Sequence, residues 1–240
     1  MKNVAVCVSG SLRSLEHCKE SIVNNVINVN KDKYNLVFFF YIPYDINYTK
    51  IELMKEYNPV ISINNDIKLK EVNIIWGGRQ KGQEGLAGDT VSTVGIQGYL
   101  QQLYGIEKSF RMIFDYEYNY NINFDLIMRL RSDVKYETPI VIDKYDISNK
   151  LIIPAFHCFY GINDRFALGN KKDMSIYMTM YSNIYKICKY YEDTYKKIMN
   201  LRQAEVYCQM NLDMHNVKYE LTKDIIFNRI RSGGIQHDKF

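Results

Sequence analysis

The sequence predicts a single α/β domain in which helices flank a central, mostly parallel sheet. Apolar runs of strand length alternate with segments of helical spacing, first at 3–8, 15–29 and 36–42, and this alternation is typical of parallel strands joined by helices. Hydrophobic residues form 47% of the chain and charged residues 24%, which indicates a folded domain and excludes a disordered chain. Because no linker, repeat or low-complexity segment interrupts the sequence, we expect one domain over 1–240.

The first half of the chain contains most of the expected parallel strands. Apolar runs bounded by small residues or proline predict strands at 3–8, 36–42, 60–63 and 72–76. Apolar residues at helical spacing predict helices at 15–29, 51–57 and 99–114. Seven of the 13 glycines lie between residues 77 and 98, so this stretch is either a mobile surface loop or a lid that orders over a ligand.

The second half of the chain continues the pattern of short strands and longer helices. The same criteria predict strands at 124–130, 151–155 and 166–168, and a late strand within 219–230. They predict helices at 173–191 and 201–214. The strand at 124–130 runs directly into charged residues, which makes its end a candidate site.

Charge and cysteine content exclude several classes of protein. The formal net charge is +4, which is too small to indicate nucleic-acid binding. The longest strongly apolar run, 36–42, is far shorter than the ~20 residues that span a bilayer, so we expect no transmembrane segment. We recognise no secretory leader, and the five cysteines include no CxxC pair, so we expect a reducing, cytoplasmic compartment.

The turn after the first strand is the first candidate site. Ser9, Gly10, Ser11 and Arg13 lie at its carboxyl end, where open α/β sheets bind ligands. Gly10 allows the backbone to approach a ligand closely, and Arg13 can donate two hydrogen bonds to a phosphate. The alternative is an ordinary turn with a surface arginine. The turn has neither the GxGxxG nor the P-loop pattern, so a dinucleotide fold and a P-loop enzyme lack support.

The second candidate site is the end of the strand at 124–130. Alternation places Arg129, Arg131 and Asp133 on one side of the chain, and such groups are costly to bury without partners. They either pair with one another as a structural cluster or serve a ligand. In the second case Asp133 binds a divalent metal that bridges a diphosphate, and the arginines hold phosphate or orient the aspartate.

At this point the sequence resembles a known family. Four segments are similar, in order and spacing, to GT-A-type glycosyltransferases of the Arg-x-Arg-x-Asp group, which occur in polysaccharide synthesis in bacteria and large DNA viruses. The segments are 6–14, 120–134, 162–174, and 203–212 with 227–231. The resemblance implies a single GT-A-type domain that moves a sugar from a UDP- or GDP-linked donor to a hydroxyl of a glycan acceptor, in the host cytoplasm if the protein is viral.

The resemblance also implies roles for individual residues and a metal cofactor. Asp133 takes the position of a ligand to Mn²⁺ or Mg²⁺, although the usual Asp-x-Asp motif reads Arg131-Ser132-Asp133 here. Ser9, Gly10 and Arg13 take the nucleotide-facing turn. A late histidine such as His237 is often a further metal ligand in this family, the alternative being a frayed C-terminal tail.

Two carboxylates are candidates for the acceptor side. Asp164 follows the strand at 151–155 and is either a base, a ligand for sugar hydroxyls, or the cap of an Asx turn. Glu205 is implied by the resemblance to lie near a sugar, whereas the dipole of the helix at 201–214 is a sufficient structural reason for it. We favour Asp164 as the base, because loops beyond strand ends display reactive groups.

Two other functions remain open at this stage. One is a catalytically inactive module that binds a glycan or a nucleotide, which the 21 tyrosines make plausible through sugar stacking. The other is a sugar-phosphate nucleotidyltransferase. That class normally has a longer glycine-rich first loop than the turn at 9–13.

Overall fold

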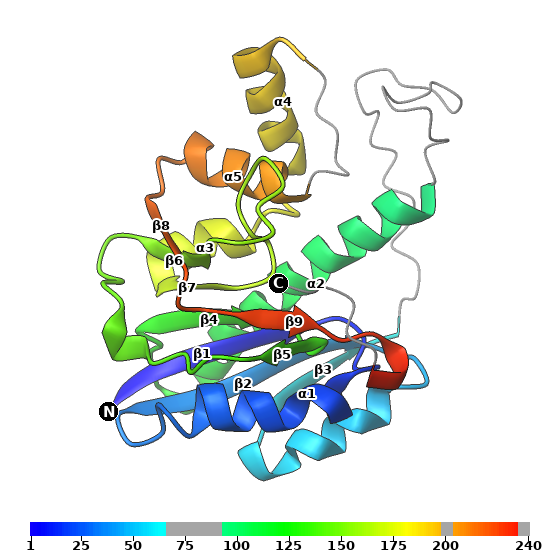
Figure 1. The fold of residues 1–240 in the computed structure, drawn as a ribbon, viewed down its shortest axis with the longest axis vertical. Helices are drawn as coiled ribbons and strands as arrows, with labels where there is room; N and C mark the ends of the chain where they lie inside the picture. Colours follow the sequence, from blue (N-terminus) through cyan, green and yellow to red (C-terminus); the bar gives the residue numbers. More distant parts are fainter. Residues whose placement is uncertain (66–92, 198–203, 235–240) are drawn as a thin grey trace.

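The computed structural model describes residues 1–65, 93–197 and 204–234 (Figure 1). Two expectations, the strand at 72–76 and the metal ligand His237, lie outside these residues. So does most of the glycine-rich stretch, up to residue 92.

A seven-stranded mixed sheet forms the centre of the molecule, with the order β3-β2-β1-β4-β7-β6-β8. All neighbouring pairs are parallel except those that β7 makes with β4 and β6, where it runs antiparallel. The predicted α/β class with a mostly parallel sheet is therefore confirmed. The strands are β1 (Lys2–Ser9), β2 (Tyr34–Pro43), β3 (Val60–Asn64), β4 (Leu126–Leu130), β6 (Leu151–Pro154), β7 (Ala167–Asn170) and β8 (Tyr219–Thr222).

Helices cover both faces of this sheet (Figure 1). One face carries α1 (Leu15–Ile22), which continues into the π-helical turn η1 (Val23–Ile27), and the 3-10 segment η2 (Tyr48–Tyr57). The other face carries α2 (Thr93–Tyr120), α3 (Lys171–Met178), α4 (Ile184–Tyr195) and α5 (Ala204–Met214). Two short 3-10 turns, η3 (Ile142–Lys144) and η4 (Ser232–Gly234), complete the described helical segments.

The predicted helix at 173–191 is wrong as a single element, because the chain breaks between α3 and α4. At the break, the Ser182 backbone N–H and hydroxyl both donate to the Glu107 carboxylate of α2. The Met180 carbonyl accepts from the Tyr207 hydroxyl of α5 (2.8 Å). Backbone groups that a continuous helix would pair internally are instead satisfied by side chains of other helices.

The late strand predicted within 219–230 is confirmed, and the range holds two strands. Its first part forms β8 at the edge of the large sheet, and its last part forms β9 (Phe227–Arg229), which pairs with β5 (Val134–Tyr136) in a separate two-stranded sheet. The bend between them buries Ile225. The small sheet packs with α1 on one face of the large sheet, and so lies beside the loop that follows β4.

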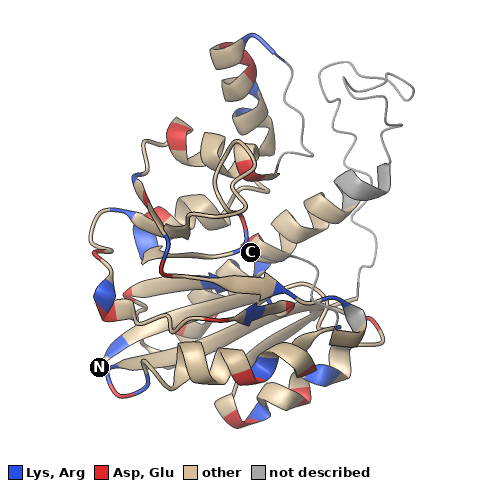
Figure 2. Cartoon of the chain, in the orientation of Figure 1, with Lys and Arg blue, Asp and Glu red and all other residues tan. Residues whose placement is uncertain are grey.

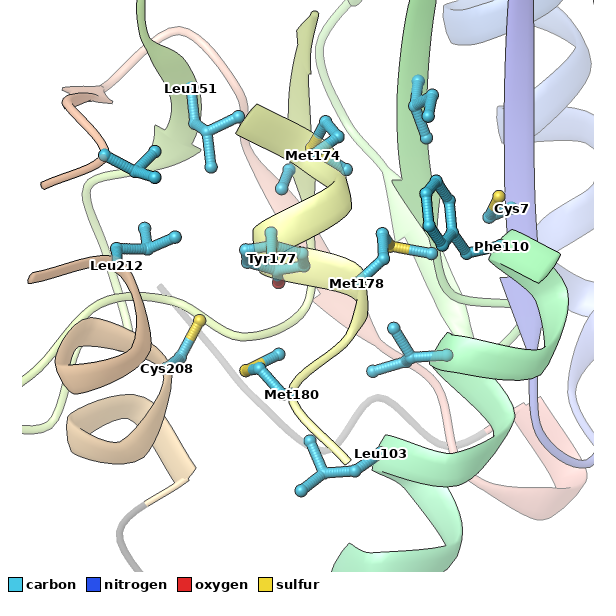
Figure 3. Packing of buried hydrophobic residues seen from close by; sticks show 14 of the residues in the cluster. Cys7, Leu103, Phe110, Leu151, Met174, Tyr177, Met178, Met180, Cys208 and Leu212 are labelled. Carbon is cyan, nitrogen blue, oxygen red and sulfur yellow. The ribbon is translucent and has the colours of Figure 1, made fainter. Parts of the chain in front are cut away.

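Two hydrophobic clusters enclose the large sheet. In β1, Ala5 and Cys7 face the cluster under α2 and α3, whereas Val4, Val6 and Val8 face the cluster under α1. Figure 3 shows Phe110 of α2, Tyr177 and Met178 of α3 and Cys208 of α5 pointing into the first of these clusters. Burial on both faces is typical of the central strands of parallel sheets, and it holds the end of β1 in a fixed position.

Charged residues lie mostly outside this apolar centre. Figure 2 shows Lys and Arg interspersed with Asp and Glu, most of them on helices and connecting loops. Within the part of the chain that the structure describes, no helix combines the length and apolar character required to cross a membrane.

Candidate functional site

Three loops meet at one edge of the large sheet. β1 and β4 are parallel neighbours, with Val8 opposite Leu130, so both carboxyl ends lie at this edge. β7 is antiparallel to β4, with Ala167 opposite Arg129, so the amino end of β7 lies there too. The topology therefore brings together the turn after β1, the loop after β4 and the loop that precedes β7, at the edge where α/β sheets bind ligands.

The turn after β1 is held by backbone and side-chain contacts. The Gly10 N–H donates to the Tyr41 carbonyl (3.2 Å), and Gly10 has φ +104, a conformation that favours glycine. The Ser11 carbonyl accepts from the Ser132 hydroxyl (3.0 Å), which ties this turn to the loop after β4. The side chain of Ser9 faces Gly105 of α2, where an added Cβ would lie 3.2 Å from the Ser9 Cβ.

Asp133 is buried between two arginines from these loops. Its Oδ1 accepts from Arg131 Nε (2.8 Å) and its Oδ2 from Arg131 Nη2 (2.9 Å), which makes a bidentate pair. Arg13 Nη2 lies 3.7 Å from the same Oδ2. Burial acts to raise the pKa of Asp133, but the Arg131 guanidinium and the charge of Arg13 outweigh it and hold the pKa at about 2. Asp133 is therefore a carboxylate at neutral pH.

Gln102 of α2 joins this ion pair to Asp164. Its Oε1 accepts from Arg131 Nη1 (2.9 Å), and its Nε2 donates to Asp164 Oδ2 (2.8 Å). A continuous polar chain thus runs from the loop after β4 across α2 to the loop before β7. Sequence reasoning missed Gln102, and no signal in the sequence distinguishes it from the other glutamines of this helix.

Asp164 lies in the loop before β7 with its side chain facing the site. The Asx turn that the sequence suggested here is made by its neighbour Asn163, whose Oδ1 accepts from the Arg165 N–H (2.8 Å). The Asn163 Nδ2 also donates to the Phe156 carbonyl (2.8 Å). Asp164 is not the cap of this turn, and its buried carboxylate instead accepts from Gln102.

Glu205 stands in the first turn of α5, next to the same loop. Gly161 packs so closely there that an added Cβ would lie 2.2 Å from the Glu205 carbonyl carbon. The Ile162 N–H donates to the Glu205 carbonyl oxygen (3.1 Å). Burial, and then the charge of Asp164, raise the pKa of Glu205 to about 7. This rise is opposite to the effect of a helix dipole on a first-turn carboxylate, so the dipole does not dominate the environment of Glu205.

Arg129 is placed differently from Arg131. It pairs with Cys7 across β1 and β4, is 2% exposed and lies beneath the loops. Its Nε and Nη1 have no hydrogen-bond partner among the residues that the structure describes. The structure therefore brings together Arg13, Arg131 and Asp133, whereas Arg129 lies in the interior and not at the surface of the site.

The described residues around Asp133 do not fit a divalent metal ion. Such an ion requires several oxygen, nitrogen or sulfur ligands, and both oxygens of Asp133 already accept from a guanidinium group. Nowhere in ranges 1–65, 93–197 and 204–234 do three His, Cys, Asp or Glu side chains gather as metal ligands would. The pairing of Asp133 with His237 lies outside the described residues.

Comparisons with known proteins give one family and a set of distant structures. A family model described as "Domain of unknown function (DUF7796)" matches residues 1–227, and no curated protein matches the chain. Mouse xyloside xylosyltransferase 1, apo form, is a similar solved structure, with 12% identity and a TM-score of 0.44 over 92% of this chain and 84% of that chain. The glycosyltransferase GlyE of Streptococcus pneumoniae TIGR4 has 13% identity and a TM-score of 0.43. That match covers 93% of this chain and 46% of the GlyE chain, so this chain spans about half of GlyE.

Proposed function

We propose that this chain, which belongs to the DUF7796 family of domains of unknown function, transfers a sugar from a nucleoside-diphosphate donor to a hydroxyl of a glycan. The observation that carries the proposal is the polar chain Arg13, Asp133, Arg131, Gln102 and Asp164 at the carboxyl ends of β1 and β4. One end of this chain has the guanidinium groups of Arg13 and Arg131, and the other has the Asp164 carboxylate, with Glu205 next to it. In glycosyl transfer from a diphosphate donor, guanidinium groups stabilise the leaving diphosphate and a carboxylate accepts the proton of the acceptor hydroxyl.

The guanidinium end suits the leaving diphosphate. The side chain of Arg13 is 39% exposed and only loosely paired with Asp133, so it is free to turn toward a phosphate. Arg131 is held on two sides, by Asp133 and by Gln102. Hydrogen-bond donors that are oriented before the reaction stabilise negative charge as it develops in the transition state. We assign Arg13 and Arg131 to the diphosphate and Asp133 to the orientation of Arg131.

The carboxylate end suits the acceptor. In the proposed reaction the acceptor oxygen bonds to the anomeric carbon, the bond to the diphosphate oxygen breaks, and the diphosphate leaves with its electron pair. The hydroxyl proton passes to a carboxylate. A base is most effective when its pKa lies near the working pH, and the pKa of Glu205 is about 7. We therefore assign the base to Glu205, and we assign Asp164, which Gln102 holds, to positioning the sugar. This order reverses our preference from the sequence.

A glycan-binding module without turnover is the second candidate. Its support is a surface suited to sugars in the loop that carries Asp164, where Tyr160 is 95% exposed and Phe159 is also exposed. Exposed rings of this kind stack on sugars in enzymes and in binding modules alike. Turnover, and not binding, separates the two candidates.

Calorimetry with UDP- and GDP-sugars, followed by an assay for donor hydrolysis and transfer, tests the proposal. We expect binding and turnover in the parent protein. Arg13→Ala should weaken nucleotide binding about 10- to 150-fold, the equivalent of losing one charge-assisted hydrogen bond. Arg111→Ala is the matched control, because Arg111 also pairs with a carboxylate, that of Glu107, on another part of α2. Binding without turnover would support the module, and unchanged affinity in Arg13→Ala would remove Arg13 from the site.

A further inference from the structure

We infer that the site holds its diphosphate through guanidinium groups alone, with Arg131 standing where a metal ion would be expected. The inference rests on the proposed function and deepens it, because it states how the donor is recognised. It starts from the disagreement between the Asp133 environment and the metal site that the sequence suggested.

Both oxygens of the Asp133 carboxylate are already paired with Arg131. Asp133 is 5% exposed, and each of its oxygens accepts a charge-assisted hydrogen bond from Arg131 at 2.8–2.9 Å. A cation bound to the remaining lone pairs of these oxygens would lie beside the Arg131 guanidinium, whose positive charge would repel it. The charges of Arg13 and Arg229 act on the same carboxylate. A divalent cation at Asp133 would therefore meet the positive charges of Arg131, Arg13 and Arg229.

Arg131 has hydrogen-bonding capacity beyond its bonds to Asp133 and Gln102. A guanidinium group carries five N–H donors in a rigid fork. Within the described residues, bonds to Asp133 Oδ1, Asp133 Oδ2 and Gln102 Oε1 use three of them. Two N–H groups on Nη1 and Nη2 remain, and the side chain is 19% exposed. The planar fork matches the spacing of phosphate oxygens, so Arg131 can bind phosphate while it keeps its bonds to Asp133 and Gln102.

Arg131 also occupies a telling position in the sequence. It is the second arginine of Arg129-Leu130-Arg131-Ser132-Asp133, at the place that the first aspartate occupies in the usual Asp-x-Asp metal motif. A carboxylate there would add a metal ligand, whereas an arginine adds the positive charge itself. The single exchange therefore accounts both for the missing ligand and for the charge that replaces the metal.

Titration of UDP and GDP into the full chain, with EDTA or with Mn²⁺, tests the inference. We expect the better of the two nucleotides to bind with affinities that agree within about twofold in the two conditions, and donor turnover to survive EDTA. Binding or turnover that requires Mn²⁺ would overturn the inference and leave the proposed function intact. Failure of both nucleotides to bind in either condition would overturn the inference together with the proposed function.

Two substitutions sharpen the test. Arg131→Asp restores two carboxylates, and we expect nucleotide affinity in EDTA to fall at least tenfold and Mn²⁺ to recover part of it. Arg131→Lys keeps the positive charge but lacks the planar fork of the guanidinium. This variant tests the role of Arg131 if circular dichroism shows that Arg131→Asp does not fold. We expect a severalfold loss in this variant that Mn²⁺ does not recover. Arg111→Lys is the control, with unchanged affinity. Parental affinity in EDTA for either Arg131 variant would refute the role of Arg131.

Discussion

A carboxyl group with a pKa near 7 changes its charge within the physiological range, and Glu205 is such a group. Its charged form is disfavoured by burial and by the neighbouring charge of Asp164. By contrast, the Asp133 carboxylate stays ionised beside Arg131. Burial raises the pKa of both carboxyl groups. The Arg131 guanidinium reverses this rise for Asp133, whereas the charge of Asp164 adds to it for Glu205.

The pH dependence of stability follows from the raised pKa of Glu205. Folding favours its protonated form, so the contribution to stability is fully present below the unfolded pKa of about 4.5 and is lost as pH rises through about 7. The full pKa shift corresponds to about 3 kcal/mol, and solvent screening of the partly exposed side chain reduces it. We therefore expect the unfolding free energy of Glu205→Gln, relative to the parent, to rise by about 1–2 kcal/mol between pH 4.5 and pH 8. Urea unfolding at several pH values measures this difference. The exposed Glu20→Gln is the control, and a flat difference for Glu205→Gln would contradict the environment described for Glu205.

Glu205→Gln also has a kinetic consequence under the proposed function. A base must be deprotonated, so the parental kcat should rise with pH and level off above about pH 7. Removal of the base should lower kcat by roughly 10²–10⁴-fold with little change in donor affinity. A pH–rate profile of parent and variant measures both effects. An unchanged kcat in Glu205→Gln, with a loss in Asp164→Asn, would return the base to Asp164.

Gln102 is the residue through which the two ends of the site are held together. Gln102→Leu removes its bonds to Arg131 and Asp164, and hydrogen bonds to charged groups contribute roughly 1.5–3 kcal/mol each. We expect kcat to fall by roughly 10- to 100-fold with a smaller change in KM, and Gln102→Glu, which retains an acceptor for Arg131, to recover part of it. The neighbouring exposed Gln101→Leu is the control. A fall in kcat/KM that comes from a higher KM alone would show that Gln102 contacts substrate and does not position Arg131.

At the scale of elements, the loop before β7 depends on its packing against α5. Gly161 allows the loop backbone to touch the first turn of this helix, and the Ile162 N–H donates to the Glu205 carbonyl. Through this contact the loop places Asp164 beside Glu205. The relative position of the two carboxylates is therefore a property of the loop–helix contact and not of either element by itself.

Gly161→Ala tests that contact. Its new Cβ would lie 2.2–2.3 Å from backbone atoms of Glu205 and Val206, which no side-chain rotation can relieve. We expect a loss of unfolding free energy of about 1–3 kcal/mol or more and a loss of turnover. Gly98→Ala is a matched control on α2, where an added Cβ meets nothing within 4 Å, and there we expect a gain of about 0.5–1 kcal/mol. Chemical unfolding of both variants decides the matter, and equal stabilities would contradict the close approach at Gly161.

At the scale of the whole molecule, one sheet separates two hydrophobic clusters and carries the site at its edge. Phe39 of β2 belongs to the cluster beneath α2 and meets Tyr116 and Phe124 edge to face, with ring centroids 5.4 and 5.5 Å apart. These rings join β2, the end of α2 and the segment that leads into β4. The core therefore fixes how α2, which carries Gln102, lies over the strands that end at the site.

Phe39→Ala measures the stability that this packing provides. A cavity in a fully buried aromatic position should lower the unfolding free energy by about 3–5 kcal/mol. Tyr118→Ala, on an exposed part of α2, should change it by less than about 0.5 kcal/mol. Urea unfolding monitored by circular dichroism compares the unfolding free energies of the two variants. A loss below 1 kcal/mol for Phe39→Ala would show that the α2 cluster is not packed as the structure describes.

The local pattern of the chain was sufficient to predict several parts of the site. β1, β4 and the strand before Asp164 were found from short apolar runs, because a strand buried on both faces leaves that signal in a single segment. The charged and small residues that directly follow β1 and β4 can be recognised in the same way, because they are adjacent to these runs in the sequence. Gly10 and Arg13 were therefore placed correctly at the sheet edge, as were Arg131 and Asp133.

What depended on distant residues was decided only by the tertiary structure. Arg131 meets Asp133 within one loop, but Gln102 and Asp164 are 62 residues apart and meet only because β7 runs antiparallel to β4. A contact between distant residues also explains the break before α4, where a carboxylate of α2 accepts a hydrogen bond from the backbone N–H of Ser182. By itself the sequence determined most of the strands and helices and which of them end in polar residues. The fold alone determined which polar groups become partners, because hydrogen bonding and desolvation depend on neighbours in space and not along the chain.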